Sequence, residues 1–302
     1  MGWKTVMKQQ KLVEKMTIEE KAAILSGKTV WQTREIDRLS IPSIFLSDGP
    51  HGIRKQAGAG DHLGLNASLN ATCFPTAATI ANSWNQDLGE EIGQALGEEA
   101  ASMDVNILLG PGLNIKRSPL CGRNFEYFSE DPYLSGKMAA SYIRGIQSKG
   151  VYACPKHLAV NSQELRRMAM DAVVDERTLR EIYLKGFEIA IKDAQPMSIM
   201  TSYNLINGIH AANNYDLCTE SARNEWGFKG AIMTDWTTTE QGDSCTASGC
   251  MRAGNDLVMP GCFGDHDNLR KGLKEGTLKI EDLRACIARL VSVIWKSNQY
   301  LQ

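Results

Sequence analysis

The sequence lacks any long hydrophobic run. A membrane-spanning helix needs about 20 mainly apolar residues in a row, and no stretch of the 302 residues approaches that length. The N-terminus, MGWKTVMKQQKL, has neither the apolar segment nor the cleavage site of a secretion signal. These absences predict a cytoplasmic protein that does not act in a membrane.

The sequence also lacks a surplus of charge of one sign. It has 33 Lys and Arg residues against 35 Asp and Glu residues, which gives a formal net charge of −2. Domains that bind nucleic acid usually carry a basic patch, so no nucleic-acid partner is expected. With 43% hydrophobic and 23% charged residues, the composition is that of an ordinary globular protein. This composition excludes disorder, collagen and a coiled coil.

Cysteine and histidine are few, and they are not spaced for metal binding. The eight cysteines include no CxxC pair. Cys245 and Cys250 have a C-x4-C spacing, but the further ligands of a zinc site are missing. No HxxxH sequence occurs among the five histidines. The sequence therefore predicts free thiols, and neither a metal nor another cofactor is expected.

The glycine motifs of nucleotide-binding folds are missing as well. No GxGxxG follows a first strand, and there is no Walker A sequence. Short apolar runs alternate instead with segments that have helical spacing. The runs are nearly continuous, which is typical of a parallel sheet that is covered on both faces. This alternation predicts an α/β fold, a (β/α)8 barrel of the TIM type that is irregular in its first strands.

The individual elements follow from the same patterns. Helices are expected over residues 17–27, 85–103, 135–148, 175–193 and 280–300. Thr17 and Glu20 have the spacing of a capping box, and Asp175 is expected to cap the fourth helix. Strands are expected at the apolar runs SIFLS, VNILLGPG, VYAC, MSIMTS, AIMT and DLVMP.

Polar residues follow the ends of four of these strands. Asp48 follows SIFLS, Lys156 and His157 follow VYAC, Tyr203 follows MSIMTS, and Asp235 follows AIMT. Active sites of α/β barrels lie at the C-terminal ends of the strands. The side chains are therefore expected to face one shared mouth. This pattern predicts an enzyme or a small-molecule site and goes no further.

Eight ordered blocks of the chain resemble the N-terminal barrel domain of glycoside hydrolase family 3, and its β-glucosidase branch in particular. The blocks are SDGPHGIR, GRNFEYFSEDP, KHLAVNSQELRRM, VDERTLREIYLKGFEIA, TSYNLING, NEWGFKG, MTDW and AGNDLVMPG. The resemblance as a whole extends from about Met16 to Arg289. The resemblance implies one barrel domain over residues 1–302, without the α/β domain that follows the barrel in multidomain members.

The resemblance also implies retaining hydrolysis of terminal, non-reducing β-linked glucose in a β-glucoside or an oligosaccharide. By similarity, Asp235 is the nucleophile, and it forms a covalent glycosyl-enzyme that water later hydrolyses. Arg123 and Lys156 are expected to hold the pKa of this carboxyl down. The residues that the resemblance places around the sugar are Asp48, Arg54, Arg123, Lys156, His157, Arg167, Tyr203 and Trp236.

One carboxyl group that the reaction needs has no match in these blocks. A retaining glycosidase places two carboxyl groups about 5–5.5 Å apart. In multidomain family members the acid/base is a Glu of the second domain, and in the hexosaminidase branch it lies on a loop reading roughly KHxPGHG, where this chain reads KHLAVNSQ. Glu126 and Glu164 are interpreted as salt-bridge partners of nearby arginines. A C-terminal α/β domain is therefore the expected partner, supplied by a longer chain or a separate subunit.

Other functions stay open at this stage. A barrel of this kind could bind sugar with little or no hydrolysis. It could also be another exo-acting hydrolase, such as a β-xylosidase, an α-arabinofuranosidase or a β-N-acetylglucosaminidase. Outside the hydrolases, Lys156 at a strand end could form a Schiff base, as in aldolase barrels. That alternative leaves Asp48, Arg123 and Asp235 without roles.

Overall fold

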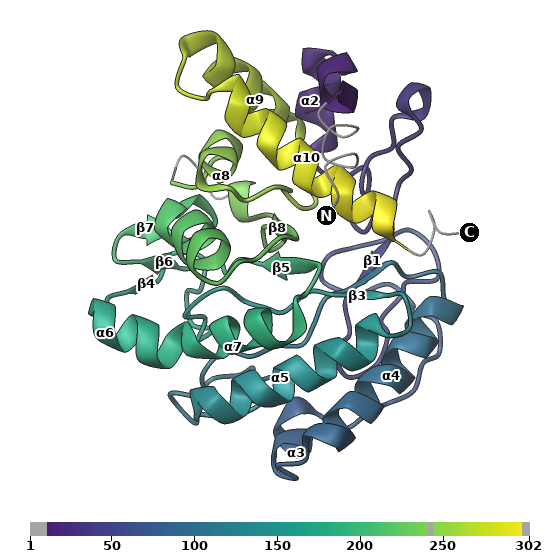
Figure 1. The fold of residues 1–302 in the computed structure, drawn as a ribbon, viewed down its shortest axis with the longest axis vertical. Helices are drawn as coiled ribbons and strands as arrows, with labels where there is room; N and C mark the ends of the chain where they lie inside the picture. Colours follow the sequence, from purple (N-terminus) through teal and green to yellow (C-terminus); the bar gives the residue numbers. More distant parts are fainter. Residues whose placement is uncertain (1–10, 241–243, 298–302) are drawn as a thin grey trace.

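Parallel strands form the centre of the computed structural model, which describes residues 11–240 and 244–297 (Figure 1). β1 (Leu46–Ser47), β2 (Ile107–Leu108) and β3 (Tyr152–Ala153) pair in parallel in chain order. β5 (Ser198–Met200) pairs in parallel with β8 (Ala231–Met233). Each of these strands lies inside an apolar run for which the sequence predicts a strand.

Isolated backbone bridges join the two sheets into a ring. The parallel bridges link Leu158 to Thr201, Met233 to Leu257, and Ser26 to Val258. The last connection to β1 is irregular, because Gln32 pairs with Phe45 in the antiparallel sense. The predicted strand DLVMP thus contributes to the ring through single bridges. The fold is a (β/α)8-type barrel whose first strand is irregular, as the sequence predicts.

Helices cover the strands on two sides (Figure 1). One side carries α4 (Gln86–Ser102), α5 (Pro132–Gln147) and α7 (Lys185–Ala194), and the other carries α2 (Ile18–Ile24), α8 (Ala247–Ala253), α9 (Phe263–Glu275) and α10 (Ile280–Lys296). Glycine lets α4 and α5 approach closely, since a Cβ atom at Gly145 would lie only 2.2 Å from the carbonyl oxygen of Glu90. This close packing leaves the strand ends as the open part of the barrel.

Local sequence sets several of the helix boundaries. The side chain of Thr17 accepts from the backbone N–H of Glu20, and the Glu20 carboxylate accepts from the backbone N–H of Thr17, so the predicted capping box is present at α2. The helix ends before Leu25, two residues earlier than the predicted Gly27. Asn85 caps α4, which lies within the predicted helix over residues 85–103. The predicted end of α10 near Tyr300 lies outside the described residues.

The helix predicted over residues 175–193 is interrupted. Asp175 caps α6 (Glu176–Thr178) as predicted, but a π-helical turn, η2 (Leu179–Tyr183), separates α6 from α7. A π turn inserts an extra residue into the helical repeat. In an uninterrupted helix the spacing of the sequence would place Ile182 on one apolar face with Gly186 and Ala190. The π turn breaks this face, so that Ile182 is 37% exposed while Gly186 and Ala190 are buried.

The remaining helices and strands were not predicted, because their sequences show no clear periodic pattern. They are α3 (Ala77–Ala81), η1 (Asp37–Leu39), η3 (Ala211–Asn213), η4 (Asp216–Glu225), η5 (Thr238–Glu240) and a small sheet of β4 (Asp171–Ala172), β6 (Leu205–Ile206) and β7 (Ile209–His210). The helices α8 and α9 were also not predicted.

All eight cysteines are free, and six of them are buried. In the part of the chain that the structure describes, no helix is long and apolar enough to span a bilayer.

A buried carboxylate connects three elements on the α10 side of the barrel. Asp256 is fully buried, and it accepts hydrogen bonds from Arg223 of η4 at 2.6 Å and from Arg289 of α10 at 2.7 Å. It also accepts from the backbone N–H of Ile232 in β8 at 2.9 Å. One side chain thereby fixes the strand β8, which leads directly to Asp235, against two helical segments.

We expect Asp256→Asn to lower the free energy of unfolding by about 3–5 kcal/mol, because removing one charge of a buried ion pair leaves its partners uncompensated. Urea unfolding followed by circular dichroism measures this change. Asp267→Asn is the matched control, since Asp267 is exposed and pairs only with Arg270 on the surface of α9. A loss below about 1 kcal/mol in Asp256→Asn would mean that these ion pairs contribute little to stability.

Candidate active site

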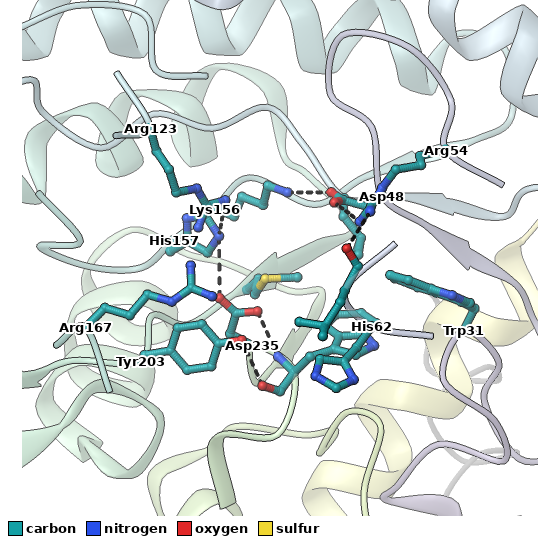
Figure 2. Close-up of a pocket in the computed structure, with 14 residues that line it drawn as sticks. Trp31, Asp48, Arg54, His62, Arg123, Lys156, His157, Arg167, Tyr203 and Asp235 are labelled. Atoms are coloured by element: carbon teal, nitrogen blue, oxygen red, sulfur yellow. Dashed lines mark hydrogen bonds and ion pairs between the residues drawn. The ribbon is translucent and has the colours of Figure 1, made fainter. Parts of the chain in front are cut away.

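A single pocket at the strand ends collects the predicted site residues (Figure 2). Its volume is about 200 Å³. The lining includes all nine predicted residues, namely Asp48, Arg54, Arg123, Lys156, His157, Arg167, Tyr203, Asp235 and Trp236. They reach the pocket from the segments that follow β1, β2, β3, β5 and β8. The expectation that the strand ends share one mouth is confirmed.

The pocket lining also includes five residues that the sequence did not predict, namely Trp31, His62, Leu63, Leu109 and Met200. Leu109 directly follows β2 and Met200 ends β5, inside the runs VNILLGPG and MSIMTS, so an argument that included the apolar residues of these runs would have found them. The other three lie on irregular segments that carry no periodic signal.

Asp235 follows β8 and is 8% exposed. Its Oδ1 accepts the backbone N–H of Trp236 at 2.8 Å, and its Oδ2 lies 3.5 Å from Nε2 of His157. Burial raises the pKa of this carboxyl, although Arg123 and Lys156 act in the opposite direction. The prediction that these two cations hold the pKa down is therefore wrong. Desolvation of the buried carboxylate outweighs their attraction.

Asp48 is held between two cations on another side of the pocket. Its Oδ1 lies 2.7 Å from Nζ of Lys156, and its Oδ2 lies 2.7 Å from Nη2 of Arg54. Burial opposes ionisation here too, but Lys156 and Arg54 hold the pKa of the Asp48 carboxyl well below its usual range. Asp48 is therefore an ionised hydrogen-bond acceptor at the pocket wall, and such charge-assisted hydrogen bonds are the stronger kind.

Glu126 and Glu164 lie behind the pocket cations. Glu126 is 5% exposed, accepts from Nε of Arg123 at 2.8 Å and lies 3.2 Å from Nζ of Lys156. Glu164 accepts from Nη1 of Arg167 at 2.7 Å and lies 3.8 Å from Nη1 of Arg123. The interpretation of both residues as salt-bridge partners is confirmed.

His157 is neutral in this arrangement. Burial, together with Arg123 and Lys156, places its pKa well below the ordinary value. Its Nε2 lies 3.1 Å from Nη2 of Arg123. Because an arginine can only donate, this nitrogen must accept, which assigns the ring proton to Nδ1, 3.3 Å from the hydroxyl of Tyr127. His157 consequently directs no proton at Asp235, and Oδ2 of Asp235 is left without a hydrogen bond from this ring.

Aromatic side chains form the apolar part of the pocket. The rings of Trp31 and Trp236 lie 5.1 Å apart with their planes inclined at 39°. The indole N–H of Trp236 donates to the carbonyl of Val30, so the ring is held in place. Tyr203 donates its hydroxyl to the carbonyl of Trp236 at 2.8 Å, while the guanidinium of Arg167 lies over the Tyr203 ring. Tyr203 thus fixes the backbone that carries Asp235.

The pocket can therefore bind a small polyhydroxylated molecule beside a reactive carboxylate. Ionised donors and acceptors surround it, and two indole rings suit the C–H face of a sugar. Across the described residues, no group of three or more His, Cys, Asp or Glu side chains is arranged to hold a metal ion. The side chains that line the pocket supply carboxylates and hydrogen-bond donors.

Comparison with known families agrees with this chemistry. The family model described as "Glycosyl hydrolase family 3 N terminal domain" matches residues 17–293. The chain belongs to this family.

Individual relatives share the same region. Thermostable beta-glucosidase B of Acetivibrio thermocellus is 50% identical over 287 residues, which are 95% of this chain and 37% of that protein. Exo-alpha-(1->6)-L-arabinopyranosidase of Bifidobacterium longum is 42% identical over 287 residues, which are again 95% of this chain and 37% of that protein. Beta-glucosidase 3B from Thermotoga neapolitana, solved in complex with glucose, superposes with a TM-score of 0.89 at 38% identity, covering 97% of this chain and 43% of that one. The chain spans less than half of each relative.

Proposed function

We propose that this chain forms the nucleophile-bearing and sugar-binding part of a retaining β-glucosidase, which removes terminal, non-reducing β-D-glucosyl residues. The observation that supports this best is the convergence of the nine predicted residues on one pocket around Asp235. The relatives named beta-glucosidase support glucose as the sugar. The arabinopyranosidase relative favours a second candidate, the removal of terminal L-arabinopyranose.

In the proposed reaction, Oδ2 of Asp235 attacks the anomeric carbon. The new C–O bond forms as the glycosidic bond breaks, and the bonding electron pair leaves with the aglycone oxygen. Oδ1 is held by the N–H of Trp236, which orients the carboxylate. Water then attacks the anomeric carbon from the opposite side and passes a proton to the acid/base, while the ester bond breaks and restores the Asp235 carboxylate, so that the configuration of the anomeric carbon is retained. Arg123 donates to His157 and stands beside the carboxylate, whose negative charge is lost as the ester forms and returns when water releases the sugar.

The sugar ring is proposed to lie between Asp235 and Asp48. Asp48, Lys156 and Arg54 form hydrogen bonds to the hydroxyls that are distant from the anomeric carbon. Ion pairs among these three side chains hold their charged groups in place. Trp31 and Trp236 contact the apolar face of the ring. Such positioning converts binding energy into orientation of the reacting atoms.

The acid/base is proposed to come from a second α/β domain, in a longer chain or a separate subunit. Glu126 is unsuited to that task, because Lys156 and Arg123 overcome the effect of burial and lower its pKa, which keeps it ionised. Glu164 is occupied by Arg167 and Arg123. The chain matches only 37% of the length of beta-glucosidase B of Acetivibrio thermocellus, so the rest of that relative is long enough to contain a further domain.

This proposal makes a direct prediction about leaving groups. The chain should hydrolyse 2,4-dinitrophenyl β-glucoside slowly but should scarcely act on cellobiose, because protonation of a poor leaving group is worth about 10²–10⁴-fold. Glucose release is measured across aryl glucosides of increasing leaving-group pKa, with aryl α-L-arabinopyranosides in parallel. Cellobiose hydrolysis as fast as that of the dinitrophenyl substrate would mean that an acid lies within this chain.

A further inference from the structure

A loop that the proposed reaction does not use overhangs the pocket. It comprises residues 57–67 and is called the arm here. An antiparallel bridge between Gln56 and Ser68 closes its base, and the N–H of Ala57 donates to the carbonyl of Ala67 at 2.8 Å. Two residues near its tip, His62 and Leu63, line the pocket together with Asp48 and Arg54. The arm is therefore part of the wall around the ligand.

Internal hydrogen bonds brace the arm. The Asp61 carboxylate accepts the backbone N–H groups of Leu65 and Asn66 at 3.0 and 2.9 Å, and the side-chain amide of Gln56 at 2.6 Å. Gln56 is 8% exposed, and its carbonyl accepts the indole N–H of Trp31 at 2.7 Å. Because Trp31 is itself a pocket wall, the arm and the aromatic wall are fixed to each other.

The tip of the arm also rests directly on Arg54. Gly64 has φ +71°, and a Cβ atom there would lie 1.5 Å from Nη1 of Arg54, so only glycine permits this approach. The carbonyl of Leu63 faces the same nitrogen at 3.5 Å. Since Nη2 of Arg54 bonds to Asp48, the guanidinium lies between Asp48 and the arm.

The position of the arm defines which end of the sugar it meets. Figure 2 shows Asp235 on one side of the pocket, with Asp48 and Arg54 on the other. In the proposed function the anomeric carbon faces Asp235. The opposite carbon of a pyranose ring carries the 4-hydroxyl, so this hydroxyl points toward Asp48, Arg54 and the arm.

We propose that the arm determines specificity by closing the space beyond the 4-hydroxyl, so that only an unsubstituted terminal sugar fits. His62 and Leu63 occupy the path along which a further 4-linked sugar would extend. The small cavity of about 200 Å³ agrees with this, because pockets for larger ligands measure about 300 Å³ or more. The inference rests on the orientation of the sugar in the proposed function.

The test compares the wild-type chain with the double variant His62→Ala/Leu63→Ala, which keeps Asp61 and Gly64. With 2,4-dinitrophenyl β-cellobioside, the wild type should release scarcely any dinitrophenol, because the second sugar does not fit and the bond between the two sugars has a poor leaving group. The variant should release intact cellobiose and dinitrophenol directly. The rate of dinitrophenol release from the cellobioside, relative to that from the glucoside, should rise at least about tenfold in the variant, the order of discrimination that a few apolar groups provide. Leu65→Ala is the matched control, since Leu65 lies on the same arm, is 82% exposed and does not line the pocket. Its relative rate of dinitrophenol release from the cellobioside should equal that of the wild type.

A binding measurement separates this inference from the proposed function. Tryptophan fluorescence should show that the wild type binds glucose at least about tenfold more tightly than 4-O-methylglucose, and that the double variant loses this preference. If neither protein cleaves the dinitrophenyl glucoside but this pattern of binding holds, the proposed function fails and the role of the arm stands. A folded double variant that keeps the preference for glucose and releases no cellobiose would overturn the inference.

Discussion

Asp235→Asn should lower the hydrolysis of 2,4-dinitrophenyl β-glucoside by about 10⁴-fold or more, the order of loss seen when a group that acts directly in the reaction is removed. The amide retains the shape of the side chain but cannot form the glycosyl ester. Because the pocket is already lined by ion pairs that do not involve Asp235, glucose binding should change far less than turnover. Steady-state rates and fluorescence titration with glucose measure the two effects separately.

Covalent labelling identifies the attacking oxygen independently of the rate. A 2-deoxy-2-fluoroglucoside with a dinitrophenyl leaving group should add the mass of one fluoroglucosyl unit to the wild type, and peptide mapping should find it on Asp235. Asp235→Asn should remain unlabelled, whereas the surface variant Asp267→Asn should label normally. A label on Glu126 or Glu164, or normal turnover in Asp235→Asn, would refute the assignment of the nucleophile.

The sequence predicts the middle of this site better than its edges. Asp48, Lys156 and Asp235 follow apolar runs directly, so their placement depends only on where a strand ends and on the rule that parallel strands end together. Arg54 and Arg167 follow no strand, and only the family resemblance pointed to them. Their positions depend on contacts with residues distant from the strand ends, such as the ion pair of Arg54 with Asp48.

Trp31 and the arm could not be predicted because no periodic pattern states where their side chains point. Trp31 is placed by its hydrogen bond to Gln56, 25 residues away, and by ring contact with Trp236. The pKa of Asp235 was missed for a related reason. Neighbouring cations can be counted from motifs, but desolvation depends on every atom that covers the carboxylate, which is a property of the tertiary structure.

Glu126→Gln should lower kcat/KM for the dinitrophenyl glucoside by about 10²-fold, although Glu126 does not line the pocket. Removing one partner of a buried charge pair costs about 2–5 kcal/mol, and about 1.36 kcal/mol corresponds to a factor of ten. Glu126 holds both Arg123 and Lys156, at 2.8 and 3.2 Å. We therefore interpret it as a positioning residue for two donors to the sugar.

The pH dependence distinguishes positioning from a loss of stability. Burial alone would lower the pKa of Lys156, but Asp48 and Glu126 outweigh burial and Arg123 and raise it. Without the charge of Glu126, the pKa of Lys156 falls, so its ammonium group loses its proton at lower pH. The alkaline limb of the pH profile of kcat/KM should then move to lower pH in Glu126→Gln. The groups facing Glu126 are Lys156, Arg123, Asp48, Tyr127 and His51.

Glu130→Gln is the matched control for this experiment, because Glu130 is exposed and belongs to the same segment before α5. Its rate and its pH profile should equal those of the wild type. A Glu126→Gln protein that unfolds at lower urea concentration but keeps the wild-type alkaline limb would show a purely structural carboxylate. A shifted limb in a protein that is still folded would show that the charge of Glu126 acts through Lys156, whose pKa Glu126 raises, because the pKa of Tyr127 is raised mainly by burial, which Glu126→Gln leaves in place.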